Sequence, residues 1–183
     1  IFKVLDIVEK QTIAPNDKVI NQFLESNGKV FIATGYGISE YNIENQEFGD
    51  SFFIGSNGAQ LAVSQITILD EILYAATYGG GIKYAEVNNP NLVDFNQWQS
   101  ISSGNWKGLT TVNGTIYAVR SNNNLFKIDN QNVLIVAAGL GLVKDFGSYE
   151  NNLIVTVADR VSIFDPNGNV INSLTSLPDG EAL

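Results

Sequence analysis

Carboxylates are the side chains on which this sequence would have to rely for acid–base chemistry, because it contains no histidine and no cysteine. Two carboxylates are enough for glycoside hydrolysis, one acting as the acid and the other as base or nucleophile. Four acidic residues lie at suitable loops or strand ends: Glu40, Asp70, Asp145 and Asp159. However, Asp70 falls in a turn at the opposite end from the others, and no two recur at matching positions. The sequence therefore predicts a protein that is not an enzyme.

Metal and cofactor sites find little support either. Without histidine and cysteine, the usual ligands of zinc and copper are missing, and nucleophilic triads cannot form within the chain. The stretch from Asp165 to Asn169 resembles the opening of a calcium-binding loop, but Val170, Ile171 and Asn172 follow where an acidic ligand would be needed. We interpret it as a Pro-Asn-Gly turn and predict no metal and no cofactor.

The glycine pair of Gly35-Tyr36-Gly37 raises the question of a phosphate-binding loop. A phosphate cradle needs backbone amides at the start of a helix, whereas these glycines precede an alternating, strand-like segment. The same place later in the chain holds Tyr78 to Gly81, then Ser121 to Asn124, and last Ala158 to Arg160. Because Asn also tolerates a positive φ, the recurring feature is a hairpin turn rather than a ligand loop.

These turns belong to a repeat of the whole chain. Strand-like segments begin at Val30, Leu73, Ile116 and Leu153, with spacings of 43, 43 and 37 residues. A second series, seven residues earlier in each unit, has the same spacings and consists of Phe23, Ile66, Leu109 and Phe146. Each unit contains about four short strands, and no helical periodicity is sustained anywhere.

Four antiparallel strands in about 40 to 45 residues are typical of a β-propeller blade. The predicted fold is therefore all-β, a propeller of four-stranded antiparallel blades, with about four repeats over residues 1–183 that start near residues 21, 64, 107 and 144. The chain begins with Ile and contains no methionine, so we expect a fragment of a longer protein. The blades are then an incomplete arc of a larger ring of roughly six to eight blades.

The innermost strands begin with polar pairs, which would surround the mouth of a central channel. The recurring turns are expected on the same face, and Trp106 is the best candidate platform there for a sugar or a cation. The predicted ligand or partner face comprises Tyr36, Tyr78, Trp106, Lys107, Asn122, Lys144, Asp159 and Arg160.

The net charge limits the partners. With 10 basic and 19 acidic residues, the formal net charge is -9, which argues against binding to nucleic acid and to an anionic membrane surface. No apolar run is long enough to span a membrane as a helix.

A more specific signal lies between Ala33 and Ala85. The segments GYGISEYNI, EFGDSFFIG, GSNGAQ and GGGI together resemble the N-terminal β-propeller of the PorZ family, cell-surface components of the type IX secretion system. The resemblance is strong over these roughly fifty residues and weaker to about Phe164. It implies a non-enzymatic scaffold or binding module on the extracellular face of the outer membrane.

In that family the attachment complex removes the C-terminal signal of secreted cargo and joins the cargo to a lipopolysaccharide. The resemblance thus implies three kinds of protein partner, namely a sortase, a barrel shuttle protein and a second outer-membrane barrel, and an anionic lipopolysaccharide as a further ligand. Two alternatives stay open. One is a periplasmic ligand-sensing propeller of a two-component regulator, and the other is a carbohydrate-active propeller enzyme.

Overall fold

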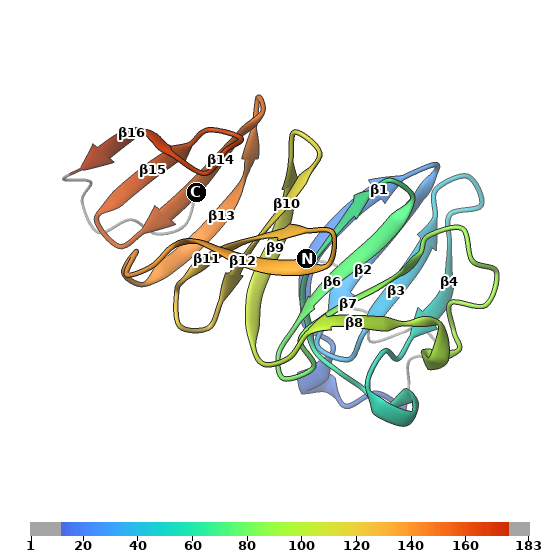
Figure 1. Cartoon of the computed structure of the whole chain (residues 1–183). Helices are drawn as coiled ribbons and strands as arrows, with labels where there is room; N and C mark the ends of the chain where they lie inside the picture. Colours follow the sequence, from blue (N-terminus) through green and yellow to red (C-terminus); the bar gives the residue numbers. More distant parts are fainter. Residues whose placement is uncertain (1–11, 176–183) are drawn as a thin grey trace.

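The computed structural model describes residues 12–175, which form four sheets of four antiparallel strands each. In every sheet the strands are hydrogen-bonded in the order of the sequence, so each sheet is a simple meander. Figure 1 shows the four sheets following one another as the blades of a propeller. The prediction of an all-β protein with four-stranded antiparallel blades is confirmed.

Each blade contributes one strand to each of four concentric positions. The innermost strands are β1 (Ile20–Ser26), β5 (Val63–Leu69), β9 (Trp106–Val112) and β13 (Val143–Tyr149). The second strands are β2 (Lys29–Thr34), β6 (Ile72–Thr77), β10 (Thr115–Arg120) and β14 (Asn152–Val157). The third strands are β3 (Ile38–Asn42), β7 (Ile82–Glu86), β11 (Leu125–Asp129) and β15 (Arg160–Phe164). The outer strands are β4 (Glu47–Phe52), β8 (Gln99–Ser102), β12 (Asn132–Ala137) and β16 (Val170–Thr175). Three single-turn 3-10 helices lie in connections: η3 (Pro15–Asp17), η4 (Ser56–Gly58) and η5 (Phe95–Gln97).

The first two strands of each blade are joined by a two-residue turn with positive φ at both positions. Asn27 and Gly28 have φ of 52° and 76°, while Asp70 and Glu71 have φ of 50° and 61°. Two positive φ values in a two-residue hairpin loop define a type I′ turn, whose twist matches that of the flanking strands. In the second blade both turn residues carry a side chain, so the left-handed backbone conformation is sterically unfavourable at Asp70 and Glu71.

The apolar core lies between the blades. Phe31 and Ile38 of the first blade pack with Ile66 and Leu73 of the second in one buried cluster. Two further clusters join the second blade to the third and the third to the fourth. Burial of apolar surface between sheets, at about 25 cal/mol per Å², therefore supplies the main force that stacks the blades.

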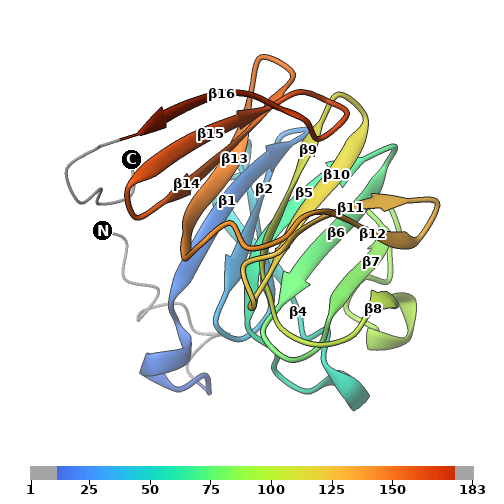
Figure 2. The ribbon, with the colours of Figure 1, turned by 60° about the vertical axis from the view of Figure 1, so that its left-hand side comes forward.

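The stack is an open arc. Among the described strands, β5 lies beside β1, β9 beside β5 and β13 beside β9, whereas β13 does not close on β1. In Figure 1 the fourth blade accordingly lies at the opposite end of the arc from β2 and β3, and in Figure 2 the view is turned so that the fourth blade comes forward. Phe23 of β1 is 59% exposed, while Ile66 and Leu109, its equivalents, are 1% exposed, since no described blade covers that face of the first blade.

The stretch that resembles a calcium loop is a turn closed by its own aspartate. Asp165 Oδ1 accepts hydrogen bonds from the backbone N–H of Asn167 at 2.9 Å and of Asn169 at 2.8 Å. These bonds, together with that from the Asn169 side chain, lower the pKa of the Asp165 carboxyl. Tyr117 donates its hydroxyl proton to the Pro166 carbonyl at 2.6 Å, so the turn also fastens the fourth blade to the third.

The type I′ turns give a stability test with a matched pair. Replacing Glu71 by Gly should raise the free energy of unfolding by about 0.5–1 kcal/mol, because Gly relieves the left-handed strain at this position. Replacing Gly28 by Glu at the equivalent turn should lower it by a similar amount, since a side chain there has open space and only the φ of 76° to oppose it. Urea denaturation measures both, and equal signs for the two variants would contradict this account.

Candidate functional site

Every inner strand contains a β-bulge directly after its first residue. In β1, Ile20 pairs with Thr34 and Gln22 with Ala33, so that Asn21 is the extra residue. The same irregularity leaves Ser64, Lys107 and Lys144 as the extra residues of the other three inner strands. A bulge changes the direction of the side chain of its extra residue. These four polar side chains therefore do not follow the alternation between the two faces of the sheet.

The re-aimed side chains connect each blade to the next. Asn21 Nδ2 donates to the carbonyl oxygen of Val63 at 2.6 Å, and Ser64 Oγ donates to that of Trp106 at 3.0 Å. Lys107 Nζ donates to the carbonyl oxygen of Val143 at 3.0 Å. In each case the acceptor is the first residue of the following inner strand. We call Asn21, Ser64 and Lys107 the bulge donors. Lys144 holds the same position in β13, is exposed, and has no described inner strand after it.

The bulge donors and Lys144 surround a polar cavity of about 190 Å³ at the start of the inner strands. We call it the mouth. Its other lining residues are Gln65, Tyr78, Val143, Asp145 and Phe146. The mouth therefore combines two ammonium groups, one carboxylate and one tyrosine, together with amide and hydroxyl groups. Such a set can bind a polar or anionic group, and its single carboxylate falls short of the pair that glycoside hydrolysis needs.

Lys107 is the most constrained cation of the mouth. Besides its bond to Val143, its Nζ donates to Asn123 Oδ1 at 2.6 Å, and the same oxygen accepts from the Val143 N–H at 3.2 Å. Burial lowers the pKa of Lys107, and the positive charge of Lys144 lowers it further. Neither ammonium group lies within 4.0 Å of a carboxylate among the described residues, Asp145 of the mouth included. Their mutual repulsion therefore favours a guest that carries negative charge.

The recurring turns lie at this end of the blades because a repeated backbone bond holds them there. The N–H groups of Gly35, Tyr78 and Ser121 donate to the residues just before the inner strands, Val19, Ala62 and Asn105, each at 3.0 Å. Tyr78 is 52% exposed and lines the mouth. Asn122 is also exposed, but it lies outside the lining of the mouth.

Two of the predicted face residues are placed differently from the expectation. Tyr36 and Trp106 are each only 1% exposed, so neither offers a surface to a partner. The Tyr36 hydroxyl shares a hydrogen bond of 2.7 Å with Ser39 Oγ. Trp106 precedes the bulge of β9 and packs edge-on against Phe126 at 5.3 Å, with the Arg120 guanidinium 5.5 Å from its ring centroid. The expectation that Trp106 is an exposed platform is therefore wrong, because its indole is core.

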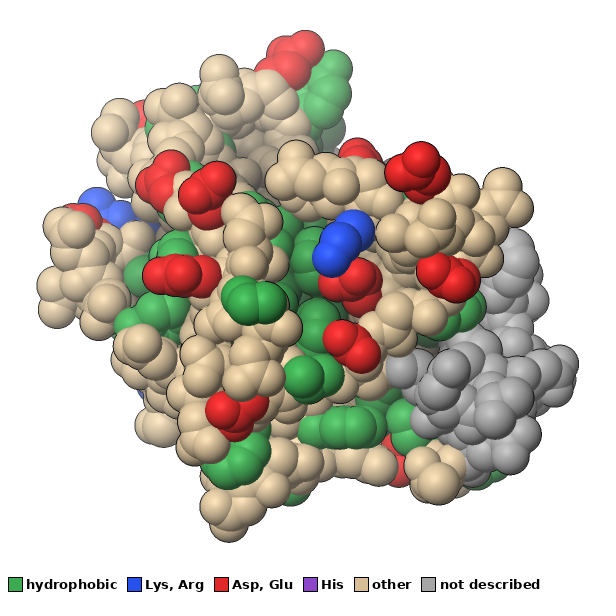
Figure 3. All heavy atoms as spheres, turned by 90° about the vertical axis from the view of Figure 1, so that its right-hand side faces the viewer, with side chains coloured by type: hydrophobic (Ala, Val, Ile, Leu, Met, Phe, Trp, Pro, Cys, Tyr) green, Lys and Arg blue, Asp and Glu red, His purple; other side chains and the backbone are tan. Residues whose placement is uncertain are grey.

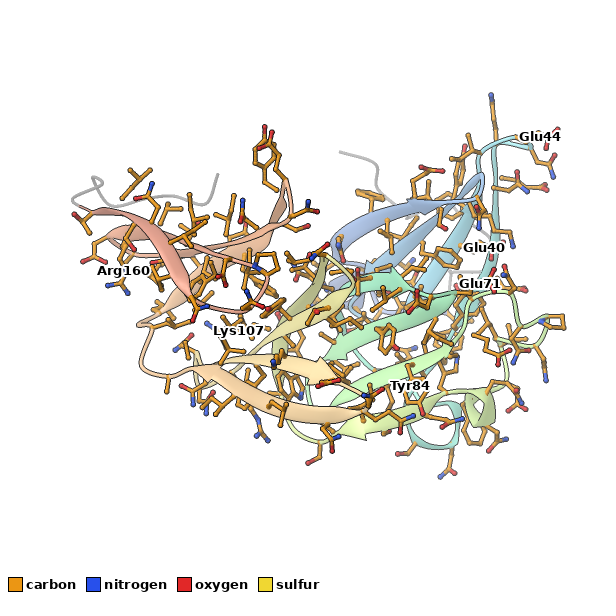
Figure 4. All side chains as sticks on the ribbon, turned by 45° about the horizontal axis from the view of Figure 1, so that its top comes forward. Glu40, Glu44, Glu71, Tyr84, Lys107 and Arg160 are labelled. Atoms are coloured by element: carbon orange, nitrogen blue, oxygen red, sulfur yellow. The ribbon has the colours of Figure 1, made fainter. Side chains whose placement is uncertain are left out.

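The remaining predicted residues lie on the fourth blade. Asp159 is exposed in the turn between β14 and β15, and Arg160 begins β15. Arg160 Nη2 donates to the Leu140 carbonyl oxygen at 3.0 Å, so this guanidinium is bound to the loop before β13. Figure 4 shows Arg160 away from Lys107, and neither Asp159 nor Arg160 lines the mouth. Of the eight predicted residues, the structure thus brings only Tyr78, Lys107 and Lys144 together in one cavity.

Three residues that shape the mouth are absent from the predicted ligand or partner face, although Gln65 and Gly108 belong to the polar pairs expected at the mouth. Asn123 was interpreted only as a turn residue with positive φ, and its φ is indeed 63°, yet its side chain also bridges two blades. Gln65 places Oε1 in a buried position where it has no hydrogen-bond partner among the described residues. Gly108 makes room for this amide, because a Cβ at that position would overlap Gln65 and Phe146. The polar pairs place the last two at the mouth, but the sequence carries no signal for their specific roles, which depend on contacts between blades.

The described part of the chain groups neither metal ligands nor the other carboxylates that were weighed for catalysis. No three His, Cys, Asp or Glu side chains within residues 12–175 come together in a way that could hold a metal ion. Glu40 is engaged with Lys29 at 2.9 Å, and Asp70 lies in the turn at the far end of β5. Residues 12–175 also include no helix with the length and apolar character needed to cross a membrane.

Comparison with known proteins identifies a family. The model of the N-terminal β-propeller domain of PorZ, a component of the type IX secretion system, matches residues 1–99, which is more than half of the chain. No curated protein sequence matches the chain.

Solved structures share the propeller architecture. PorZ of Porphyromonas gingivalis, described as an essential surface component of the type IX secretion system, superposes with a TM-score of 0.70 at 15% identity, over 86% of this chain and 21% of that chain. BamB from Moraxella catarrhalis has a TM-score of 0.63 at 15% identity, over 90% and 53% of the two chains. The extracellular domain of a protein described as a one component system, from B. thetaiotaomicron, has a TM-score of 0.65 at 18% identity, over 85% and 24%. At these identities the likeness shows the fold alone, and this chain spans about a fifth of the length of PorZ.

The bulge donors make a prediction about stability. Replacing Lys107 by Met removes both of its hydrogen bonds and leaves the Val143 carbonyl without its side-chain donor. We expect the free energy of unfolding to fall by about 1–3 kcal/mol. The matched variant, Lys144→Met, changes an exposed lysine at the same strand position and should stay within about 0.5 kcal/mol of the wild type. Urea denaturation of the two variants checks this, and equal losses would show that the bond to the next blade contributes nothing.

Proposed function

Since this chain belongs to the family of PorZ N-terminal β-propeller domains, we propose that it is a non-enzymatic binding module of the type IX secretion system's cell-surface attachment complex. The match over residues 1–99 is the observation that carries the proposal. Its partners in this proposal are the sortase and outer-membrane barrel proteins of that complex, and its place is the extracellular face of the outer membrane. Its role is to assist the processing of secreted cargo and its attachment to lipopolysaccharide.

The mouth is the proposed partner face. It combines the exposed side chains of Tyr78 and Lys144 with the fixed ammonium group of Lys107. An aromatic ring beside cationic groups suits the sugar faces and the negative charges of an anionic lipopolysaccharide. The net charge of -9 supports the choice of the mouth, because most other surfaces of the chain would repel an anionic partner.

Asn122, Asp159 and Arg160 extend this face in the proposal. Asn122 and Asp159 are exposed in the turns of the third and fourth blades, and Arg160 is half-buried beside its turn. They would contact a partner protein that covers the blade ends, rather than a small group inside the mouth.

A ligand-sensing propeller is the second candidate. It is favoured by the presence of a polar cavity at the inner strands and by the likeness in fold to the extracellular domain of a one component system. That role requires a signalling partner in place of a sortase, so the identity of recovered proteins separates the two candidates. The enzyme alternative has less support, since only Asp145 among the weighed carboxylates lines the mouth.

Affinity recovery from gently solubilised outer membranes tests the proposal. The tagged protein that contains this chain should recover a sortase and barrel proteins, identified by mass spectrometry, together with lipopolysaccharide. The double variant Tyr78→Ala and Lys144→Gln should recover at least about fivefold less, because two exposed mouth side chains are lost.

Tyr149→Ala is the matched control. Tyr149 is 64% exposed and ends β13, far along the strand from Lys144, so this variant should recover partners as the wild type does. Recovery of no secretion component by the wild type would overturn the proposed function. Recovery of a sensor kinase alone would replace it with ligand sensing, and equal recovery by the double variant would exclude the mouth as the partner face.

A further inference from the structure

A second kind of cavity lies between neighbouring blades, away from the mouth. The groove between the second and third blades has a volume of about 480 Å³ and is lined by Tyr74 of β6 and Tyr84 of β7. The two rings stack with centroids 5.9 Å apart and an interplanar angle of 25°. Ile101, Ile116 and Ile128 add apolar surface. We call this cavity the tyrosine groove, and Figure 4 shows Tyr84 well apart from Lys107.

Negative charge prevails at the edge of the tyrosine groove. Asp70, in the turn after β5, and Asp129, at the end of β11, are exposed and line it, against the single cation Lys127. Within residues 12–175, the one ion pair closer than 4.0 Å joins Lys29 to Glu40. Neither Asp70 nor Asp129 therefore forms an ion pair with a described lysine or arginine. Asp70 is close enough to Tyr74 for its charge to help raise the pKa of that phenol, after burial and Tyr84. The raised pKa keeps Tyr74 a neutral phenol at neutral pH.

An equivalent groove in the same molecule has a lysine of the chain itself in its lining. The groove between the first and second blades, of about 320 Å³, is lined by Asn27, Phe31 and Glu40, and also by Lys29 and Asp50. There the Lys29 ammonium lies 2.9 Å from Glu40 Oε1. Figure 3 shows acidic side chains over this face of the molecule, with basic ones sparse. This groove thus shows a cation paired with a carboxylate in a cavity that Phe31 also lines.

The repeat relates the two grooves position by position. Asn27, Lys29 and Phe31 of the first groove correspond, 43 residues later, to Asp70, Ile72 and Tyr74. Glu40 pairs with Phe31 as Tyr84 pairs with Tyr74. The tyrosine groove therefore has the Asp70 carboxylate in place of the Asn27 amide and Tyr84 in place of Glu40, and it has Ile72 where the first groove has Lys29. Its chemistry suits a cation, and the chain does not supply one from the corresponding position.

We propose that the tyrosine groove is a docking site for an arginine side chain of a partner protein. A guanidinium stacks on an aromatic face and forms paired hydrogen bonds with carboxylates, which matches Tyr74 and Tyr84 beside Asp70 and Asp129. The molecule already shows this stacking in its core, where the Arg120 guanidinium lies 5.5 Å from the Trp106 ring centroid. The proposal does not depend on the secretion role, because it uses neither the mouth nor the family match.

Titration by two-dimensional NMR with the peptide acetyl-Gly-Arg-Gly-amide tests the site. The amides of Tyr74, Tyr84 and Asp129 should shift on a saturable curve. The isosteric peptide with citrulline in place of arginine should bind at least about fivefold more weakly, because its side chain is uncharged. The double variant Asp70→Asn and Asp129→Asn should show a similar loss for the arginine peptide, and Asn suits the positive φ of residue 70. The spectrum of the variant itself reports that it is folded.

Asp50→Asn is the matched control, because it removes a carboxylate from the first groove, and binding of the arginine peptide should be unchanged. Equal binding of the arginine and citrulline peptides would overturn the proposal. So would undiminished binding by the double aspartate variant, or the absence of shifts at the tyrosine groove. Preferential binding of acetyl-Gly-Glu-Gly-amide would instead make Lys127 the recognition group and likewise contradict it.

Discussion

One misaligned residue at the start of each inner strand determines how the blades meet. A β-strand alternates its side chains between two faces, and in a blade both faces are needed for packing against neighbouring sheets. The bulge places an extra residue outside this alternation, and its side chain then reaches the carbonyl oxygen that opens the next inner strand. Asn21, Ser64 and Lys107 use three different donor groups for the same bond. The constraint is therefore a position in the strand rather than a residue type.

The same constraint creates the mouth. Because the bulge donors must lie at the start of the inner strands, polar groups converge where the arc is concave, while the apolar clusters remain between the blades. Lys107 serves both purposes, since it is bonded to the next blade and lines the cavity. The two grooves between blades at the end opposite to the mouth differ from one blade pair to the next. Their variable chemistry makes them suited to partner-specific contacts.

Much of the fold could be predicted from the sequence because the repeat is regular. The spacing of Phe23, Ile66, Leu109 and Phe146, together with the Asn-Gly turns, gives the four-stranded meander directly. The polar pairs at the strand starts indicated a mouth. The sequence could not show the bulges, because a bulge is defined by the register of a strand against its partner. The alternation of apolar and polar residues along one strand does not reveal that register. For that reason Trp106, one residue before a bulge, looked like an exposed platform and is buried, whereas Asn123 looked like a simple turn residue and joins two blades.

Hydrogen exchange at the Ile66 amide is the most direct test of the claim that polar side-chain bonds fix how neighbouring inner strands meet, within blades stacked by apolar burial. This N–H donates to Gln22 Oε1 of the preceding blade at 2.6 Å. If the blades separate only on global unfolding, the amide should exchange with a free energy close to that of global unfolding, as buried core strands do. Exchange as fast as that of the exposed outer strand β16 would mean that the blades part independently, and it would contradict the account.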